Sequence, residues 1–285
     1  MRPSALALLA FLALVVLHAP AAAQLYAARE APVAYGHHHV NASDLDAHER
    51  FWAGALGGRR VQVGTSNARV IAFPNVLVFL AERAPTGGTK GTLVNHVGFE
   101  VRDIRAAVAR LREGGFRMVT REELPASYDV VDDLGSRPGG NVVAFVMGPD
   151  ETKVELLENP SIEHPIQLHH VHYSTPEGAA MQAWYAEHFG GETGTRIGQP
   201  EVRLPGVRLT FAPTSDPVAP TRGRALDHVG FEVKNLREVI ARLEASGITM
   251  DRGYTEVASM GIAVAFLTDP WGTYIELTEG LAAVE

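Results

Sequence analysis

The sequence contains no cysteine, which excludes a disulfide framework, thiolate metal sites and a cysteine nucleophile. It also lacks an excess of positive charge. Acidic residues outnumber basic ones by 33 to 25, and the formal net charge of −8 offers no basic face for duplex nucleic acid. Beyond the N-terminal region, no run of about twenty apolar residues could span a bilayer. Histidine, in contrast, occurs 12 times, so we expect polar chemistry in this chain to depend on imidazole and carboxylate groups.

The first 23 residues have the pattern of a secretory signal peptide. Arg2 precedes an unbroken apolar run over residues 5–17, and residues 21–23 are alanines that suit a cleavage site. The run is shorter than the roughly twenty residues of a transmembrane helix, although a retained N-terminal anchor is the alternative. We therefore expect an exported protein, periplasmic or secreted, with no membrane attachment after cleavage.

The sequence after this segment is a tandem repeat. NHVGFEVRDIRAAVARLREGGF at residues 95–116 aligns without a gap with DHVGFEVKNLREVIARLEASGI at residues 227–248, and half of the paired positions are identical. The motif HHVN, which begins at His38, has a counterpart in HHVHYST, which begins at His169. The predicted organisation is a signal peptide at 1–23, an N-terminal domain at 33–158 and a C-terminal domain at 166–281.

Each half divides again into two units. Every unit begins with a strand pattern, continues with an amphipathic helix, and ends in short strand-like runs such as NVLVFLAE or IAVAFLTD. Ser43 with Asp46 resembles a capping box, and Asp103 and Asn235 stand at equivalent helix starts. The predicted fold class is α+β, with four βαβββ modules, two from each half.

Alternation along the strands predicts which residues face away from the helices. In the HVGFEV strand of the first half, Val97 and Phe99 point to one face and His96 points to the other. The same parity applies to the opening and closing strands of both halves. The polar residues predicted on that second face are, in chain order, His39, His96, Glu155, His170, His172, His228 and Glu276.

If the two modules of one half pair side by side, their polar faces form one concave sheet that gathers two histidines and a glutamate. Two neutral imidazoles and a carboxylate suit a divalent zinc, manganese or iron(II) ion, with positions left open for water or substrate. A structural role stays open as the alternative, because a histidine on a strand is often only hydrogen-bonded and a duplication copies idle residues too. The predicted sets are His39, His96 and Glu155 in the first half, and His170, His228 and Glu276 in the second.

The motifs HHVN and HHVHYST, the HVGFEV strands and the DP-G turn into IEL resemble the glyoxalase, bleomycin-resistance and extradiol-dioxygenase group, the vicinal oxygen chelate superfamily. The resemblance extends from Tyr35 to Glu279. It implies two tandem glyoxalase-like cups, each built from paired modules, and a divalent metal held at the same six positions that strand parity selects. It also implies a small substrate with adjacent oxygen atoms as the partner, and leaves a homodimer open.

The sequence departs from parts of this family. The resemblance to glyoxalase I implies a fourth ligand, usually Glu, where Phe79 and Thr210 stand, so the remaining donor set is more similar to that of ring-cleaving dioxygenases. Those enzymes use an acid/base histidine that the segment RLTFAPTS does not supply. We therefore consider His172 as the acid/base, with Tyr254 or Tyr274 as proton donors, although Tyr274 also suits a packing role.

Some residues are left without a role in chemistry. We assign none to the remaining histidines of the opening strands, which are His37, His38 and His169. The first half also carries an insertion, PASYDVVDDLGSRPGG at residues 125–140, which contains Tyr128, Asp132 and Asp133; it is either a lid over one cup or a solvated acidic loop.

Two functions of different kinds follow. The first is an exported metal-dependent enzyme, a dioxygenase or a lyase, that chelates vicinal oxygens of a small organic substrate. The alternative is a non-catalytic protein that binds or sequesters a small molecule without metal, as in the bleomycin-resistance branch. A further alternative is that the N-terminal half only supports a working C-terminal half.

Overall fold

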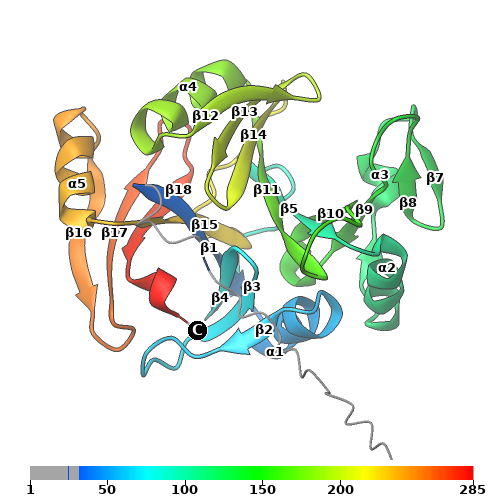
Figure 1. The fold of residues 1–285 in the computed structure, drawn as a ribbon, viewed down its shortest axis with the longest axis horizontal. Helices are drawn as coiled ribbons and strands as arrows, with labels where there is room; N and C mark the ends of the chain where they lie inside the picture. The colour runs from blue at the N-terminus through cyan, green and yellow to red at the C-terminus, as the bar shows by residue number, and fades with distance from the viewer. Residues whose placement is uncertain (1–24, 26–31, 285) are drawn as a thin grey trace, which may run out of the picture.

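The structure, a computed structural model, describes residue 25 and residues 32–284. The predicted signal peptide lies outside the described residues. Four modules follow one another along the chain, each with an opening strand, a helix and further strands (Figure 1). The predicted α+β fold with four βαβββ modules is confirmed.

The first half contains modules 1 and 2. Module 1 consists of β1 (Val33–Ala42), α1 (Leu45–Glu49), which continues as a π-helical segment (Arg50–Ala55), β2 (Arg59–Val61), β3 (Arg69–Phe73) and β4 (Val76–Glu82). Module 2 consists of β5 (Val94–Val101), α2 (Ile104–Glu113), β6 (Arg117–Met118), α3 (Thr120–Glu123), β7 (Asp129–Val131), β8 (Leu134–Ser136), β9 (Val143–Met147), a 3-10 turn (Pro149–Glu151) and β10 (Lys153–Glu158).

The second half contains modules 3 and 4. Module 3 consists of β11 (Ile166–Thr175), α4 (Gly178–Phe189), β12 (Glu192–Arg196), β13 (Gln199–Leu204) and β14 (Val207–Pro213). Module 4 consists of β15 (Leu226–Val233), α5 (Leu236–Ala245), β16 (Met250–Val257), β17 (Ile262–Thr268), β18 (Tyr274–Glu279) and a 3-10 turn (Leu281–Ala283).

The helix starts follow the local capping signals, with one difference. Asp103 and Asn235 accept hydrogen bonds from the first-turn amides of α2 and α5, as predicted. At α1, the cap is Asp44 instead of Ser43, and the Ser43 hydroxyl donates to Asp150 in the turn before β10. The predicted capping box at Ser43 is therefore wrong, because a tertiary contact takes the serine side chain.

The modules pair across the two halves of the chain. One sheet has eight strands in the order β16-β17-β18-β15-β1-β4-β3-β2, so it joins module 4 to module 1 through the antiparallel pair β1 and β15. The other sheet joins module 3 to module 2 through β11 and β5, in the order β12-β13-β14-β11-β5-β10-β9-β8-β7. In Figure 1 the orange and red strands of module 4 accordingly lie beside the blue strand β1. The predicted pairing of modules within one half is wrong, and each cup contains strands from both halves.

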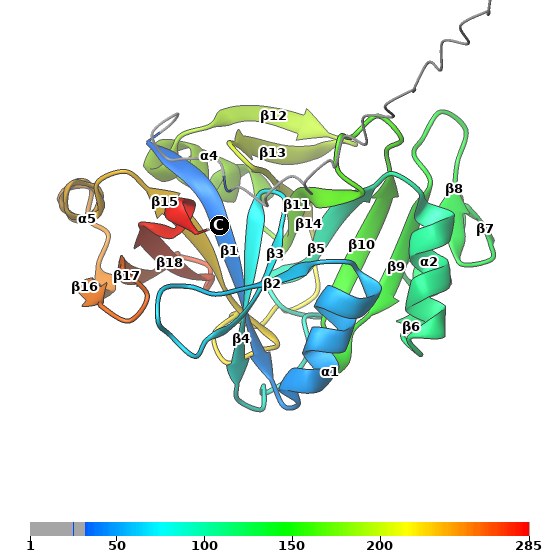
Figure 2. The same cartoon turned by 60° about the horizontal axis from the view of Figure 1, so that its bottom comes forward.

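The modules of one half instead meet through the faces that carry their helices. Two aromatic residues from the helical segment of module 1 contact module 2. The ring centroid of Phe51 lies 4.9 Å from that of Phe116, and the ring centroid of Trp52 lies 6.3 Å from that of Phe99. In Figure 2, α1 and α2 lie on the same side of the molecule. Because this packing buries the apolar faces, the opposite, concave face of each sheet remains for the polar residues.

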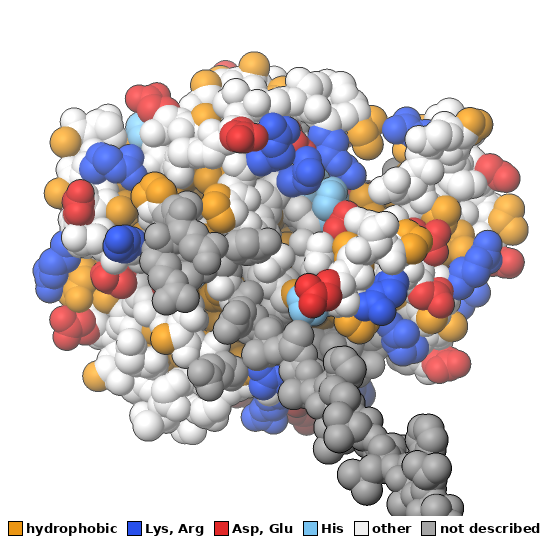
Figure 3. Space-filling view, in the orientation of Figure 1, with side chains coloured by type: hydrophobic (Ala, Val, Ile, Leu, Met, Phe, Trp, Pro, Cys, Tyr) orange, Lys and Arg blue, Asp and Glu red, His pale blue; other side chains and the backbone are white. Residues whose placement is uncertain are grey.

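The outer surface carries charges of both signs. Figure 3 shows blue Lys and Arg side chains interspersed with red Asp and Glu side chains on the face in view. In the part of the chain that the structure describes, no helix combines the length and the apolar character needed to cross a bilayer.

Candidate metal centres

The first candidate centre lies on the eight-stranded sheet and consists of His37, His228 and Glu276; we call it the Glu276 centre. The Nε2 atoms of His37 and His228 each lie 2.9 Å from the same Oε2 atom of Glu276, and all three residues are buried. They come from three neighbouring strands, β1, β15 and β18. His37 pairs with Gly230, which in turn pairs with Glu276, so the strand register places these side chains in one row.

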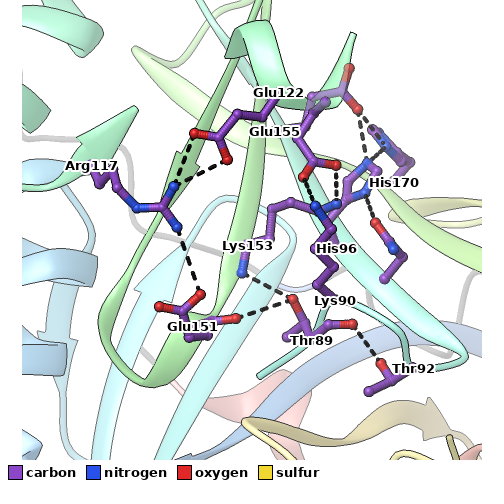
Figure 4. A network of polar contacts seen from close by, with 12 residues as sticks. Thr89, Lys90, Thr92, His96, Arg117, Glu122, Glu151, Lys153, Glu155 and His170 are labelled. Atoms are coloured by element: carbon purple, nitrogen blue, oxygen red, sulfur yellow. Dashed lines mark hydrogen bonds and ion pairs between the residues drawn. The ribbon is translucent and has the colours of Figure 1, made fainter. Parts of the chain in front are cut away.

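The second candidate centre, the Glu155 centre, consists of His96, His170 and Glu155 on the ten-stranded sheet. The Nε2 atoms of His96 and His170 each lie 3.1 Å from Oε2 of Glu155, and 3.4 Å from one another. Figure 4 shows the Glu155 carboxylate directed toward both rings. His170 pairs with Gly98, which pairs with Glu155, so the row of the first centre is repeated.

A glycine beneath one imidazole makes each row possible. A Cβ atom at Gly230 would lie 2.0 Å from Cε1 of His37, and a Cβ atom at Gly98 would lie 2.0 Å from Cε1 of His170. The ring therefore occupies the space above the central strand. The glycine of HVGFEV serves this close approach in both halves.

The repeat register of the opening strands differs from the predicted one. Since His37 pairs with Gly230 and His170 with Gly98, His37 is the counterpart of His170, and His39 is the counterpart of His172. Alignment of the two HHV motifs instead pairs His38 with His169, and His37 was for this reason predicted to have no role. The His-x-His spacing, which both opening strands share, is the signal that would have found it.

The predicted ligand sets are therefore wrong in their grouping. His228 and Glu276 lie with His37 and beside His39, whereas His96 and Glu155 lie with His170. The physical reason is the pairing of modules 1 with 4 and 2 with 3. Both halves supply residues to both candidate centres, so neither half forms a centre alone.

His39 and His172 occupy equivalent places next to the two centres. The ring of His39 lies 4.4 Å from that of His228, and the ring of His172 stacks on that of His96 at the same centroid distance. Burial is the main cause that lowers the pKa of His39 to about 3, and the charge of the nearby His228 adds to it. Burial and the charge of His96 lower the pKa of His172 in the same way. Both rings are therefore neutral.

The predicted combination of His172 with two tyrosines is not found. His172 lies beside the Glu155 centre, whereas Tyr274 packs its ring 5.4 Å from that of His228, at the Glu276 centre, and stacks on Phe266. Tyr254 lies at neither centre, because its ring packs under Arg237 of α5 and its hydroxyl donates to Glu256. The structure thus supports the packing role for Tyr274.

Hydrogen bonds behind the histidines orient them. Nδ1 of His228 lies 2.7 Å from Oδ1 of Asp227, and Nδ1 of His96 lies 3.0 Å from Oδ1 of Asn95, the equivalent residue. Each contact leaves Nε2 facing the glutamate. Nδ1 of His170 lies 2.8 Å from Nδ1 of His169, which gives His169 a place beside the Glu155 centre that sequence analysis did not expect.

The charges suit a divalent cation. Burial opposes ionisation of Glu155 and Glu276, but the facing histidines hold the pKa of both carboxyl groups well below the usual range. Burial lowers the pKa of His96 to about 4, although Glu155 acts in the opposite direction. Metal binding requires neutral imidazoles around an ionised carboxylate, and the lowered pKa of His96 suits that state. At the Glu276 centre burial opposes protonation of His228, but Asp227 and Glu276 raise its pKa overall, so an incoming ion would displace a proton there. These donor sets therefore fit a divalent metal ion.

The two centres open into different cavities. A cavity of about 180 Å³ reaches the Glu276 centre, and its walls are mainly apolar; they include Phe79, Val257, Met260, Ile262, Val264, Phe266 and Leu281. A cavity of about 270 Å³ reaches Glu155 and has more polar walls, among them Tyr128, Arg137, Asn141 and Arg196. Phe79 lies opposite His39, and Thr210 opposite His172, so the fourth ligand position holds no carboxylate in either cup.

The insertion at 125–140 forms one wall of the second cavity. It folds as the β7–β8 hairpin and the loop that follows, and Tyr128 borders the cavity at Glu155. Asp132 and Asp133 lie at the hairpin turn, where Asp133 pairs with Arg112 of α2. The insertion therefore shapes one cup.

Comparisons with known proteins agree with this architecture. Family models of the glyoxalase/bleomycin resistance protein/dioxygenase superfamily match residues 36–131 and 167–277. The structure is similar to that of glyoxalase I from Zea mays, with a TM-score of 0.67 and 14% identity over 88% of this chain and 94% of that chain. It is also similar to a candidate dioxygenase from Bacillus subtilis, with a TM-score of 0.60 and 14% identity over 87% and 86% of the two chains.

A comparison with curated protein sequences gave no match. At 14% identity the two structural similarities concern the fold, whereas the two family matches concern the sequence of each half. Together with the four modules and the two cups, they show that the chain belongs to the vicinal oxygen chelate superfamily, as a member with two glyoxalase-like domains in tandem.

Proposed function

We propose that this protein is a metal-dependent enzyme that binds two adjacent oxygen atoms of a small organic substrate. The observation that carries the proposal is the duplicated convergence of side chains. In each cup two imidazole Nε2 atoms approach one carboxylate oxygen, at 2.9 Å in the Glu276 centre and at 3.1 Å in the Glu155 centre. Zinc, manganese and iron(II) all accept two imidazoles and one carboxylate, and both dioxygenase and lyase chemistry are compatible with such a set.

The residues of the Glu276 centre have distinct roles in this proposal. His37, His228 and Glu276 hold the ion, and Asp227 fixes the His228 tautomer so that Nε2 faces the cavity. When bound, the ion would supply Lewis-acid stabilisation of the negative charge that develops on the substrate oxygens. Phe79 and Phe266 line the cavity and exclude water from the bound substrate.

We also propose that proton transfer falls to the histidine beside each centre. His39 lines the Glu276 cavity, and His172 occupies the equivalent place in the other cup. Neither side chain makes a hydrogen bond within the part of the chain that the structure describes, so each ring nitrogen is available to a substrate. Alanine at His39 or His172 should abolish turnover in the corresponding cup and leave its metal content unchanged.

Metal analysis of the purified protein tests the proposal. We expect two divalent ions per chain, one after Glu276→Gln or Glu155→Gln alone, and none in the double variant. His164→Gln, in the segment between β10 and β11 and outside both centres, is the control and should retain two. A wild-type chain that takes up no zinc, manganese or anaerobically supplied iron(II) would refute the proposal. Catechols, thiol adducts and epoxides are the first substrates to test with the loaded protein.

The apolar cavity favours one other function, which is binding of a small molecule without metal. Aromatic and aliphatic side chains form most of its wall, and the His–Glu contacts are satisfied hydrogen bonds as they stand. This alternative predicts ligand binding that Glu276→Gln and chelators do not weaken. The enzyme proposal predicts the opposite result for both treatments.

We propose in addition that the mature protein is exported, to the periplasm or to the medium. The apolar run at residues 5–17 and the following alanines support this proposal. Cell fractionation and N-terminal sequencing of the mature chain test it, with a new N-terminus near residue 24 as the expected result. A chain that keeps Met1 and stays in the cytoplasm would contradict it.

A further inference from the structure

The cavity at Glu155 contains two arginines that have no carboxylate partner. Arg137 and Arg196 both line it, together with Tyr128 and Asn141. Within residues 32–284 neither guanidinium lies within 4.0 Å of a carboxylate. Arg203 and Arg208, in contrast, both pair with the buried Glu201 nearby. The cavity therefore offers positive charge that the protein itself does not neutralise.

One of these arginines is presented by a strained turn. Arg196 ends β12, and the two-residue turn to β13 consists of Ile197 and Gly198, with φ angles of 51° and 76°. Glycine adopts such angles freely, but a β-branched residue rarely does. Ile197 is also 61% exposed and borders the cavity, so packing does not explain its presence. Strain of this kind is typical of residues kept for ligand contact.

The other arginine, Arg137, belongs to the insertion at 125–140, whose start is fixed by hydrogen bonds. Arg121 donates hydrogen bonds to the carbonyl oxygens of Leu124, Pro125 and Tyr128, which fixes the start of the insertion. The guanidinium of Arg137 lies 5.3 Å from the centroid of the Tyr128 ring. The cationic side chain thus stands on a scaffold that the rest of module 2 supports.

The other cup lacks this wall. In module 4, α5 leads to the long strand β16 without an inserted hairpin, and the residues that β16 and β17 contribute to the Glu276 cavity are Arg252, Val257, Ile262, Val264 and Phe266. Arg252 is the single arginine, and no lysine is present, among the described residues that line that cavity, and its Nε atom donates to Thr255. The two cups therefore present different surfaces to a ligand.

We infer that the Glu155 cup binds a small substrate with an anionic group, such as a carboxylate, between Arg137 and Arg196. The inference rests on the proposed function, because the opposite end of this substrate carries the adjacent oxygens that face the metal at Glu155. Guanidinium groups recognise carboxylates through paired, charge-assisted hydrogen bonds. The Glu276 cup, with its apolar wall, takes a neutral ligand instead.

Calorimetric titration of the zinc-loaded Glu276→Gln variant isolates the Glu155 cup. The probes are 3,4-dihydroxybenzoate and 4-methylcatechol, which share the two adjacent hydroxyl groups and differ in the carboxylate. We expect the first to bind about tenfold tighter or more, and this preference to disappear in the additional variants Arg137→Gln and Arg196→Gln. Arg252→Gln, which removes a cation from the other cavity, is the matched control and should retain the preference.

The metal content of each sample separates the two proposals. Equal binding of the two probes, or a preference that survives both arginine substitutions, would overturn the inference if the chain holds one zinc ion. If the Glu276→Gln variant holds no zinc, the proposed function fails at the Glu155 centre. In that case, 4-hydroxybenzoate tests the anion site without chelation: binding that depends on both arginines supports the site, and no such dependence refutes it.

Discussion

At the scale of single residues, Gly230 lies beneath the imidazole of His37, where a methyl group would occupy the space of the ring. We expect Gly230→Ala to displace His37, to lower the metal content from two ions to one, and to cost about 1–3 kcal/mol of unfolding free energy through overpacking. Metal analysis and urea denaturation measure the two effects. Gly253→Ala, where nothing lies within 4 Å of the added carbon, is the control and should change neither.

A second prediction at this scale concerns Asp227 and Asn95, which contact the equivalent histidines of the two centres. A carboxylate makes the imidazole a better donor than an amide does, and loss of such a partner typically weakens metal affinity about 10–100-fold. Asp227→Asn should therefore weaken zinc binding at the Glu276 centre, whereas Asn95→Asp should tighten it at the Glu155 centre. Competition with a chromophoric chelator measures each affinity in a variant that keeps one centre. If the two substitutions changed the zinc affinity equally, or each in the direction opposite to the expected one, these residues would not act through the histidines.

At the scale of elements, Asp150 ties the start of α1 to the turn before β10. Its carboxylate accepts from the amide and hydroxyl of Ser43 and lies 3.0 Å from Nε2 of His48. Partial burial opposes ionisation, but the bonds from Ser43 and His48 lower the pKa of Asp150 overall.

A carboxyl group with a lowered pKa in the folded state stabilises the fold above its unfolded pKa, and this contribution disappears as the pH falls. We expect Asp150→Ala to cost about 1–3 kcal/mol at pH 7, and this cost to shrink as the pH approaches 3. Urea denaturation of both proteins across this pH range measures the difference. A cost that does not depend on pH would mean that the carboxylate charge contributes nothing.

The elements show what the sequence could predict and where it failed. The helix caps at Asp103 and Asn235 and the faces of the strands that carry the histidines and glutamates follow from local spacing, and both were predicted correctly. The alignment of β1 with its repeat counterpart β11 was not predicted correctly, because the three consecutive histidines of β1 allow two alignments. Only the pairing of His37 with Gly230 decides between these alignments, and that contact joins residues far apart in the chain.

At the scale of the whole molecule, the exchange of modules between the halves has a direct test. His37→Ala and Glu276→Gln lie in different halves but remove ligands of the same centre, so their combination should still leave one metal ion per chain. His37→Ala combined with His96→Ala, both in the first half, should leave none. Metal analysis of the two double variants distinguishes the observed pairing from one within each half, which would give the reverse result.

Metal removal should also be visible in the stability of the whole fold. A ligand that binds only the folded state adds about 2.7 kcal/mol at a free concentration one hundred times its Kd. We therefore expect a chelator to lower the Tm of the wild-type chain, and to have no effect on the Glu155→Gln, Glu276→Gln double variant. Differential scanning calorimetry measures both, and an equal shift in the two proteins would contradict metal binding at these centres.

The pairing of modules could not be predicted from local patterns, because all four modules have the same alternation and the same helix. Whether modules pair within one half or across the two halves, their paired opening strands bury the same kinds of residues. Both arrangements also bring two histidines together with one glutamate. The choice depends on which helix faces pack, as Phe51 does against Phe116 and Trp52 against Phe99 between modules 1 and 2. Such complementarity of shape is a property of the folded chain.

The crossed arrangement has a consequence for the order in which the molecule can be completed. Every residue of the Glu155 centre is supplied by the middle of the polypeptide, from β5 to β11, whereas the Glu276 centre joins the opening strand to the closing one. A growing chain can thus complete the cup of the Glu155 centre before its C-terminal strands are made. The cup of the Glu276 centre cannot form until β18, the last strand, has been made. A truncation that removes β18 would therefore disable this cup and leave the residues of the Glu155 centre in place.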